Sequence, residues 1–232
     1  MSLIKYDIVW AGIDAGREGL WRDPLWRGVL KIVGNHPGQS VYDASSPIYG
    51  DLMAQFPREK WKSTEASGKF RPLFRDYPNA WTRTGVLNLE GKEFNLTPLG
   101  LSVVKGETSK EKVILDLLRR HNEKSDYSPS GIEYPFSIIA SAFLEYGQGL
   151  TPSEVFWGIM KNYRPSDDIK AVISKTVPRI TELPESTPLR RLKNMLWLMR
   201  HIDAVQSVRR GKTIYWEPSN EATLQNLCRT PI

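Results

Sequence analysis

Apolar side chains recur every three or four residues in several stretches of the chain, which is the spacing of one helical face. In DPLWRGVLKIVGNHPG, Leu25 and Ile32 follow this spacing, and we expect Asp23 to cap the helix and Pro24 to occupy its first position. A second helical pattern, SVYDASSPIYGDLMAQF, contains Pro47. Because proline cannot continue a helix without distortion, this helix must bend at Pro47 or begin afresh there.

Two other stretches alternate apolar and polar residues around a turn, which predicts β-hairpins. In VLNLEGKEFNL the turn falls at Glu90-Gly91, and in AVQSVRRGKTIYWEP it falls within residues 209–212. Thr97-Pro98 predicts a short helix after the first hairpin, ending at Gly106. Ser219 is expected to start a last helix after the second hairpin.

Further helices are predicted between the hairpins. Thr108 with Glu111, and Thr151 with Glu154, have the spacing of a capping box, in which each side chain bonds the other residue's backbone. Thr187-Pro188 opens a third helix, LRRLKNMLWLMRHID. Each half of the chain is therefore expected to end in a helix, a hairpin and another helix.

This order predicts a mainly α fold with short β-hairpins (α+β). A three-helix core followed by a two-stranded ribbon is the plan of a winged helix-turn-helix, whose third helix can enter the major groove. Two such tandem units fit the length of 232 residues. We predict a first unit over residues 1–106, with an N-terminal extension, and a second over residues 107–232.

The charge of the chain favours polyanionic partners, since 32 Lys and Arg against 26 Asp and Glu give a net charge of +6. Single basic residues are common on any soluble protein, but here they cluster where the third helix and the ribbon of each unit are expected. In the first unit the basic side chains suit phosphates, and Asn79, Arg75 and Arg83 have the geometry to read bases instead. In the second unit, Arg190, Arg191, Lys193 and Asn194 occupy the helix end that a recognition helix presents to base edges. The candidate DNA-binding residues are Lys60, Lys62, Lys69, Arg71, Arg75, Asn79, Arg83, Lys92, Arg190, Arg191, Lys193, Asn194, Arg209, Arg210 and Lys212.

Aromatic residues divide into two groups. Those on predicted helical faces are expected to pack in the core, whereas those in the basic stretch from Arg58 to Gly85 are candidates to contact sugars or bases. The second group consists of Trp61, Tyr77 and Trp81.

A nuclease site is the main chemical alternative. Asp76, Glu90 and Lys92 are the residue types of a Mg²⁺-dependent nuclease, but the tip of a hairpin holds a carboxylate and a lysine poorly. The histidines are isolated from one another and Cys228 has no histidine nearby, so we predict no catalytic constellation, no metal site and no cofactor in this chain. Mg²⁺ would be needed only by an attached nuclease domain.

Compartment and membrane association follow from simple counts. A single cysteine allows no internal disulfide, which favours a reducing compartment. No apolar run reaches the roughly 18 residues of a membrane span, and MSLIKYDIVW lacks the pattern of a signal peptide. We therefore expect a cytoplasmic protein without a membrane partner.

The run from Arg71 to Gly106, RPLFRDYPNAWTRTGVLNLEGKEFNLTPLGLSVVKG, resembles DNA-recognition regions of type II restriction endonucleases of the AlwI and FokI kind. The shared pattern is an arginine-rich segment, a short apolar strand, a wing and a Leu-Thr-Pro-Leu-Gly helix start. The resemblance covers 36 of the 232 residues and implies tandem winged helices that bind a specific duplex sequence while a separate domain cuts. It implies no catalytic residue here.

The sequence thus predicts sequence- or modification-specific binding of double-stranded DNA, as the recognition domain or subunit of a restriction-endonuclease-like or defence protein. A nuclease domain or subunit is the expected protein partner. The alternatives are a Mg²⁺-dependent endonuclease in its own right, a winged-helix transcription regulator, and a module that docks another protein.

Overall fold

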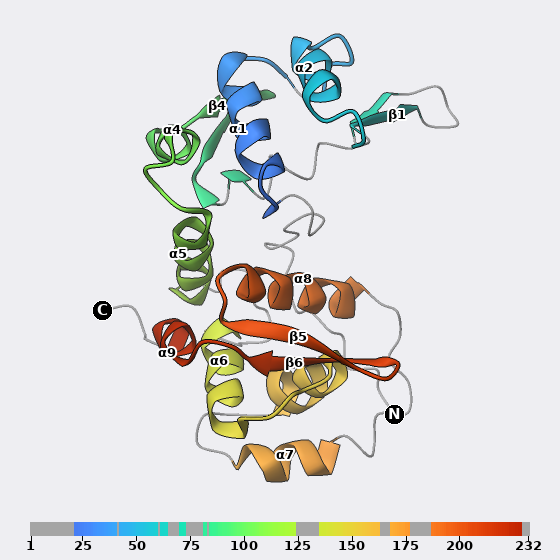
Figure 1. The fold of residues 1–232 in the computed structure, drawn as a ribbon, viewed down its shortest axis with the longest axis vertical. Helices are drawn as coiled ribbons and strands as arrows, with labels where there is room; N and C mark the ends of the chain where they lie inside the picture. Colours follow the sequence, from blue (N-terminus) through green and yellow to red (C-terminus); the bar gives the residue numbers. More distant parts are fainter. Residues whose placement is uncertain are drawn as a thin grey trace. The chain divides into compact units, whose positions relative to one another are not determined.

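The computed structural model describes residues 21–40, 42–59, 61–64, 70–72, 81–82, 84–123, 135–162, 168–176 and 187–228. The chain divides into two compact units, and the division falls between Val113 and Ile114. We call the described residues up to Val113 the N-terminal unit and those from Ile114 onward the C-terminal unit. The fold is mixed α and β, and its described strands pair into three antiparallel two-stranded sheets (Figure 1).

The elements of the N-terminal unit are mainly short. They are α1 (Leu25–Asn35), α2 (Pro47–Gln55), β1 (Lys62–Thr64), β2 (Phe70–Pro72), β3 (Leu87–Glu90), β4 (Glu93–Leu96) and α4 (Pro98–Lys105). Helix α5 (Lys110–Glu123) crosses the division between the units.

The C-terminal unit contains the longer hairpin. Its elements are α6 (Pro135–Tyr146), the π-helical segment η3 (Glu154–Asn162), α7 (Ile169–Thr176), α8 (Thr187–His201), β5 (Val205–Arg210), β6 (Thr213–Pro218) and α9 (Glu221–Cys228). The predicted α+β class is therefore confirmed.

The starts of the first two helices follow from their prolines. The cap of α1 is Pro24, which makes no side-chain capping bond, so the expected cap at Asp23 is wrong. The Asp23 carboxylate instead lies 3.7 Å from Lys110 Nζ and 3.9 Å from Arg27 Nε. Pro47 begins α2 afresh in its first turn, where the missing N–H costs no helical hydrogen bond.

Hydroxyl groups fix several other helix starts. The expected capping box is confirmed at η3, because Thr151 N donates to Glu154 Oε2 at 2.6 Å and Glu154 N to Thr151 Oγ1 at 3.2 Å. Two other predicted caps are wrong by one residue. Ser109 rather than Thr108 accepts from the first turn of α5, and Asn220 rather than Ser219 caps α9.

The core of the N-terminal unit is built around tryptophans. Trp21 stacks on Trp26 with ring centroids 4.9 Å apart, and Trp26 meets the edge of Trp81 at 5.5 Å. Trp61 and Trp81 are 2% and 0% exposed, so the expectation that they face nucleic acid is wrong. Burial of their large apolar surface stabilises the unit instead.

The two units share an arrangement around their hairpins. A residue in the left-handed backbone conformation ends the turn before each hairpin, Gly85 before β3–β4 and Asp203 before β5–β6. After the hairpin the chain returns, and Thr97 N donates to Val86 O at 3.2 Å just as Ser219 N donates to Ala204 O at 3.1 Å. The same backbone design therefore encloses both hairpins, although the sequences differ.

A single extended residue also pairs with the second strand of each hairpin. Ser40, between α1 and α2, bridges Glu93 of β4, and Leu150, between α6 and η3, bridges Trp216 of β6. The second bridge has both of its hydrogen bonds, Leu150 N to Trp216 O at 2.8 Å and Trp216 N to Leu150 O at 2.7 Å. Each hairpin is thereby tied to the helices that precede it.

Candidate nucleic-acid interface

Helix α8 has one buried and one accessible side. Leu192, Met195 and Met199 are buried, whereas Lys193 and Arg200 are exposed and seven residues apart. Since seven residues make nearly two turns, these two basic residues lie on one face, and Trp197 lies between them. Position 190 belongs to the same face by helical spacing, while position 191 shares the face of Met195 and Leu198.

Aromatic contacts fix this face to the hairpin. The Trp197 ring meets the Trp216 ring edge-on at a centroid distance of 5.4 Å, and the Arg200 guanidinium lies 5.0 Å above the Trp197 ring. A cation over an indole is attracted by the negative face of the ring. The edge contact of Trp197 with Trp216, and the Trp197 ring beneath Arg200, therefore hold a guanidinium on the accessible side of α8.

The tip of the β5–β6 hairpin is basic. Arg209, Arg210 and Lys212 are exposed there around Gly211, whose φ of +62° is easily reached by glycine. Arg209 Nε donates to Gly211 O at 3.2 Å. The strand register pairs Ser207 with Trp216 and Arg209 with Ile214, so Arg209 belongs to the hairpin face that carries Trp216.

Arg210 belongs to the opposite face of the hairpin. Its guanidinium forms an ion pair with Glu217 and lies 5.0 Å from the Tyr215 ring centroid. The register pairs Val208 with Tyr215, which places both contacts on the face away from Trp216. Arg210 is thus committed to its own hairpin, whereas Lys212 makes no ion pair within the described residues.

The N-terminal hairpin carries a different charge. Its tip has Glu90 and Glu93 directly opposite each other and a single basic residue, Lys92. Glu90 Oε1 accepts from Asn88 Nδ2 at 2.9 Å and is exposed. A phosphate would meet more negative than positive charge here, so Lys92 is a poor candidate for DNA contact.

The nuclease alternative is not supported by the described residues. Glu90 and Lys92 lie at an exposed hairpin tip, and Asp76 lies outside the described residues. No three His, Cys, Asp or Glu side chains in the described part of the chain are grouped so that they could hold a metal ion.

The remaining predicted site residues divide into three sets. Lys62 and Arg71 lie in the paired strands β1 and β2, so the expected third helix does not carry them. Arg190, Arg191, Lys193 and Asn194 occupy the first two turns of α8, as predicted. Lys60, Lys69, Arg75, Asn79 and Arg83 lie outside the described residues, as does Tyr77.

Sequence reasoning missed Arg200 and Trp197. The signal was available, because Lys193, Trp197 and Arg200 follow the i, i+4, i+7 spacing of a helical face that the apolar residues leave free. Only the contact between Trp197 and Trp216 distinguishes this tryptophan from an ordinary core residue.

Among the described residues, no helix combines the length and apolar character needed to cross a membrane. Comparison with models of known protein families and with curated proteins finds neither a family nor a relative that matches the chain.

Proposed function

We propose that the C-terminal unit binds double-stranded DNA as a winged helix, with α8 in the major groove and the β5–β6 tip on the adjacent backbone. One observation carries the proposal: the accessible face of α8 and the hairpin docked on it through Trp197 and Trp216 both present basic side chains. A helix followed by a basic ribbon is how winged helices contact both a groove and the neighbouring phosphates.

The order of elements supports this assignment. Helix α6, the bridging residue Leu150, the helical segment η3, helix α8 and the β5–β6 hairpin follow one another as the parts of a winged helix do. Helix α7 is an addition between η3 and α8. In this assignment α8 is the recognition helix because it leads directly into the hairpin.

Electrostatics identify the phosphate contacts. Lys193 and Lys212 are exposed and make no ion pair within the described residues, so their full charge is available to a phosphate. Arg210 is paired with Glu217 and would contribute less. The N-terminal hairpin, with two glutamates at its tip, is not part of the proposed surface.

Fluorescence anisotropy with a labelled random duplex, measured over a series of salt concentrations, tests the proposal. A double variant, Lys193→Gln with Lys212→Gln, is compared with Lys170→Gln with Lys175→Gln. The second pair removes the same charge from α7, which lies at the opposite end of this unit from α8 (Figure 1). Each lost phosphate contact is expected to reduce the slope of log K against log salt by about 0.9.

We expect the α8 and hairpin variant to lose affinity and up to about two units of slope, and the α7 variant to keep the slope of the unaltered protein. Identical slopes for the two variants would mean that the salt dependence of binding reflects only the net charge of the protein, and would refute the proposed surface. Absence of binding at low salt would refute the function itself.

The resemblance of Arg71 to Gly106 to recognition regions of restriction endonucleases supports a narrower proposal, that the protein reads a specific sequence or modified base for such a system. Selection of bound oligonucleotides from a random pool, with and without methylation, tests this. An Arg200→Ala variant should lose more affinity for the selected site than for random duplex. If Arg200→Ala lowers the affinity for both duplexes equally, Arg200 contacts a phosphate and does not read a base.

A further inference from the structure

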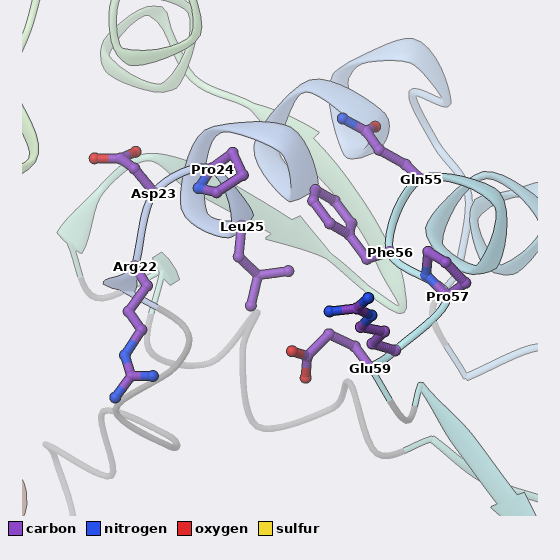
Figure 2. A pocket seen from close by; sticks show the side chains of 9 residues that line it. Arg22, Asp23, Pro24, Leu25, Gln55, Phe56, Pro57 and Glu59 are labelled. Atoms are coloured by element: carbon purple, nitrogen blue, oxygen red, sulfur yellow. The ribbon is translucent and has the colours of Figure 1, made fainter.

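The N-terminal unit has a pocket of about 360 Å³ where α1 begins and α2 ends (Figure 2). Two short segments line it, residues 22–25 and residues 55–59. The volume lies in the range of small-molecule pockets in proteins. Nothing in the proposed DNA surface of the C-terminal unit uses this pocket.

One wall of the pocket is apolar. Leu25 and Phe56 approach each other across it from the two segments (Figure 2). The Phe56 ring packs closely against Gly28, since a methyl group added to Gly28 would come within 2.4 Å of Phe56 Cζ. On another side, the ring centroid of Phe56 lies 6.1 Å from that of Trp61. The half-buried Phe56 ring is therefore a fixed surface on which a flat ligand can stack.

The rim of the pocket is polar, and some of its side chains make no hydrogen bond or ion pair within the described residues. Asp23 points away from the pocket toward Lys110 and Arg27, with which it forms ion pairs (Figure 2). Gln55, Arg58 and Glu59 are exposed, and their side chains make no hydrogen bond or ion pair within the described residues. A guanidinium and a carboxylate are thus available beside one aromatic wall.

We propose that this pocket binds an adenine or cytosine nucleotide and recognises the exocyclic amino group at N6 or N4 of the base, which guanine and thymine replace with a carbonyl oxygen. The base would stack on Phe56, and Glu59 would accept a hydrogen bond from the amino group, as carboxylates do with cytosine N4. Arg58 would bind the phosphate.

The nucleotide has two possible sources with the same chemistry. It is either a free nucleotide or a nucleotide extruded from duplex DNA, since enzymes that act on a base accommodate the unstacked base in a pocket. The basic stretch that begins at Arg58 favours the polynucleotide source. Only this second source rests on the proposed DNA-binding function.

Calorimetric titration of the full chain with AMP, CMP, GMP and TMP is the first experiment. We expect AMP or CMP to bind at least about fivefold more tightly than TMP, the range that one base contact provides. Glu59→Gln and Phe56→Leu should each lower that affinity by a similar factor. Glu107→Gln, an exposed glutamate that does not line the pocket, should leave it unchanged.

Because Glu59 is exposed, its substitution should not disturb folding, which keeps the test valid if Phe56→Leu fails to fold. The second experiment uses duplexes with 2-aminopurine directly beside an adenine or a cytosine, since its fluorescence rises when that neighbouring base leaves the stack. A rise that Glu59→Gln abolishes supports the extruded nucleotide, whereas monophosphate binding without a rise supports the free one.

The inference is overturned if none of the four monophosphates binds and no duplex shows a rise. It is equally overturned if Glu59→Gln and Phe56→Leu both bind as the unaltered protein does. If monophosphates bind but duplex DNA does not, the proposed DNA-binding function fails and the nucleotide pocket stands, so the two failures are distinguishable.

Discussion

Two glycines in the N-terminal unit illustrate how differently the same residue type is constrained. At Gly100, in α4, an added methyl group would lie 2.1 Å from the carbonyl oxygen of Val86. At Gly50, in α2, it would meet nothing within 4 Å. Close approach of two backbone segments therefore requires glycine at position 100, whereas position 50 has no such requirement.

Gly100→Ala is expected to destabilise the protein by about 1–3 kcal/mol, the usual cost of forcing extra atoms into a packed site. Gly50→Ala is expected to be neutral or to stabilise it by up to about 1 kcal/mol, because alanine favours the helix. Urea denaturation followed by tryptophan fluorescence measures both. Equal effects of the two substitutions would contradict the close contact at Gly100.

Cys228 illustrates a titratable group governed by its surroundings. Burial between α9 and α6 raises the pKa of its thiol, against an opposing hydrogen bond with Ser141 Oγ at 3.3 Å, while the Glu145 carboxylate raises the pKa further. A raised pKa means a smaller thiolate fraction at neutral pH.

We therefore expect alkylation of Cys228 at pH 7 to be slower than that of a model thiol and to accelerate only as the pH rises above the ordinary thiol pKa. Mass spectrometry after timed treatment with iodoacetamide measures the rate. The urea-unfolded chain is the control and should react as a model thiol does. A native rate equal to the unfolded rate would show that burial does not protect the sulfur.

At the scale of elements, the docking of the β5–β6 hairpin on α8 depends strongly on one aromatic pair. Trp197→Leu removes the edge contact with Trp216 and the ring beneath Arg200. We expect the free energy of unfolding to fall by about 1 kcal/mol, which is what an aromatic pair typically contributes in addition to the burial of its surface. Hydrogen exchange of the β5 and β6 amides should become correspondingly faster.

Trp197→Phe is the matched control, because it keeps an aromatic ring in the same place. We expect it to retain most of the amide protection. Unchanged exchange in Trp197→Leu would mean that backbone pairing alone, including the bridge from Leu150 to Trp216, holds the hairpin.

Local patterns predicted most of the helices and two of the three described strand pairs, and they missed the pairing of β1 with β2. Proline and glycine act on the backbone of their own turn, so Pro47, Thr97-Pro98 and Gly106 mark element boundaries without help from the rest of the fold. Caps were less predictable. Thr108 and Ser109 are chemically alike, and only the path of the chain decides which hydroxyl faces the free N–H groups.

At the scale of the whole molecule, each unit has its own buried core, the tryptophan cluster in one and the side chains around α6, α8 and α9 in the other. Separate cores favour separate unfolding transitions. Differential scanning calorimetry is expected to give a calorimetric enthalpy greater than the van't Hoff enthalpy. Gly100→Ala should lower the midpoint of one transition and leave the other in place. A single transition that shifts as a whole would contradict independent cores.

The sequence by itself determined the class of fold, the two hairpins and the basic residues at the second hairpin tip, because these depend on periodicity and turn chemistry within short stretches. It could not tell that Trp61 and Trp81 are buried, since burial depends on which distant residues come together. Nor could it tell that Trp197 contacts the second hairpin. Only the packing that sets Trp216 against Trp197 beneath Arg200 decided that the basic hairpin tip and an exposed guanidinium of α8 belong to one docked pair of elements.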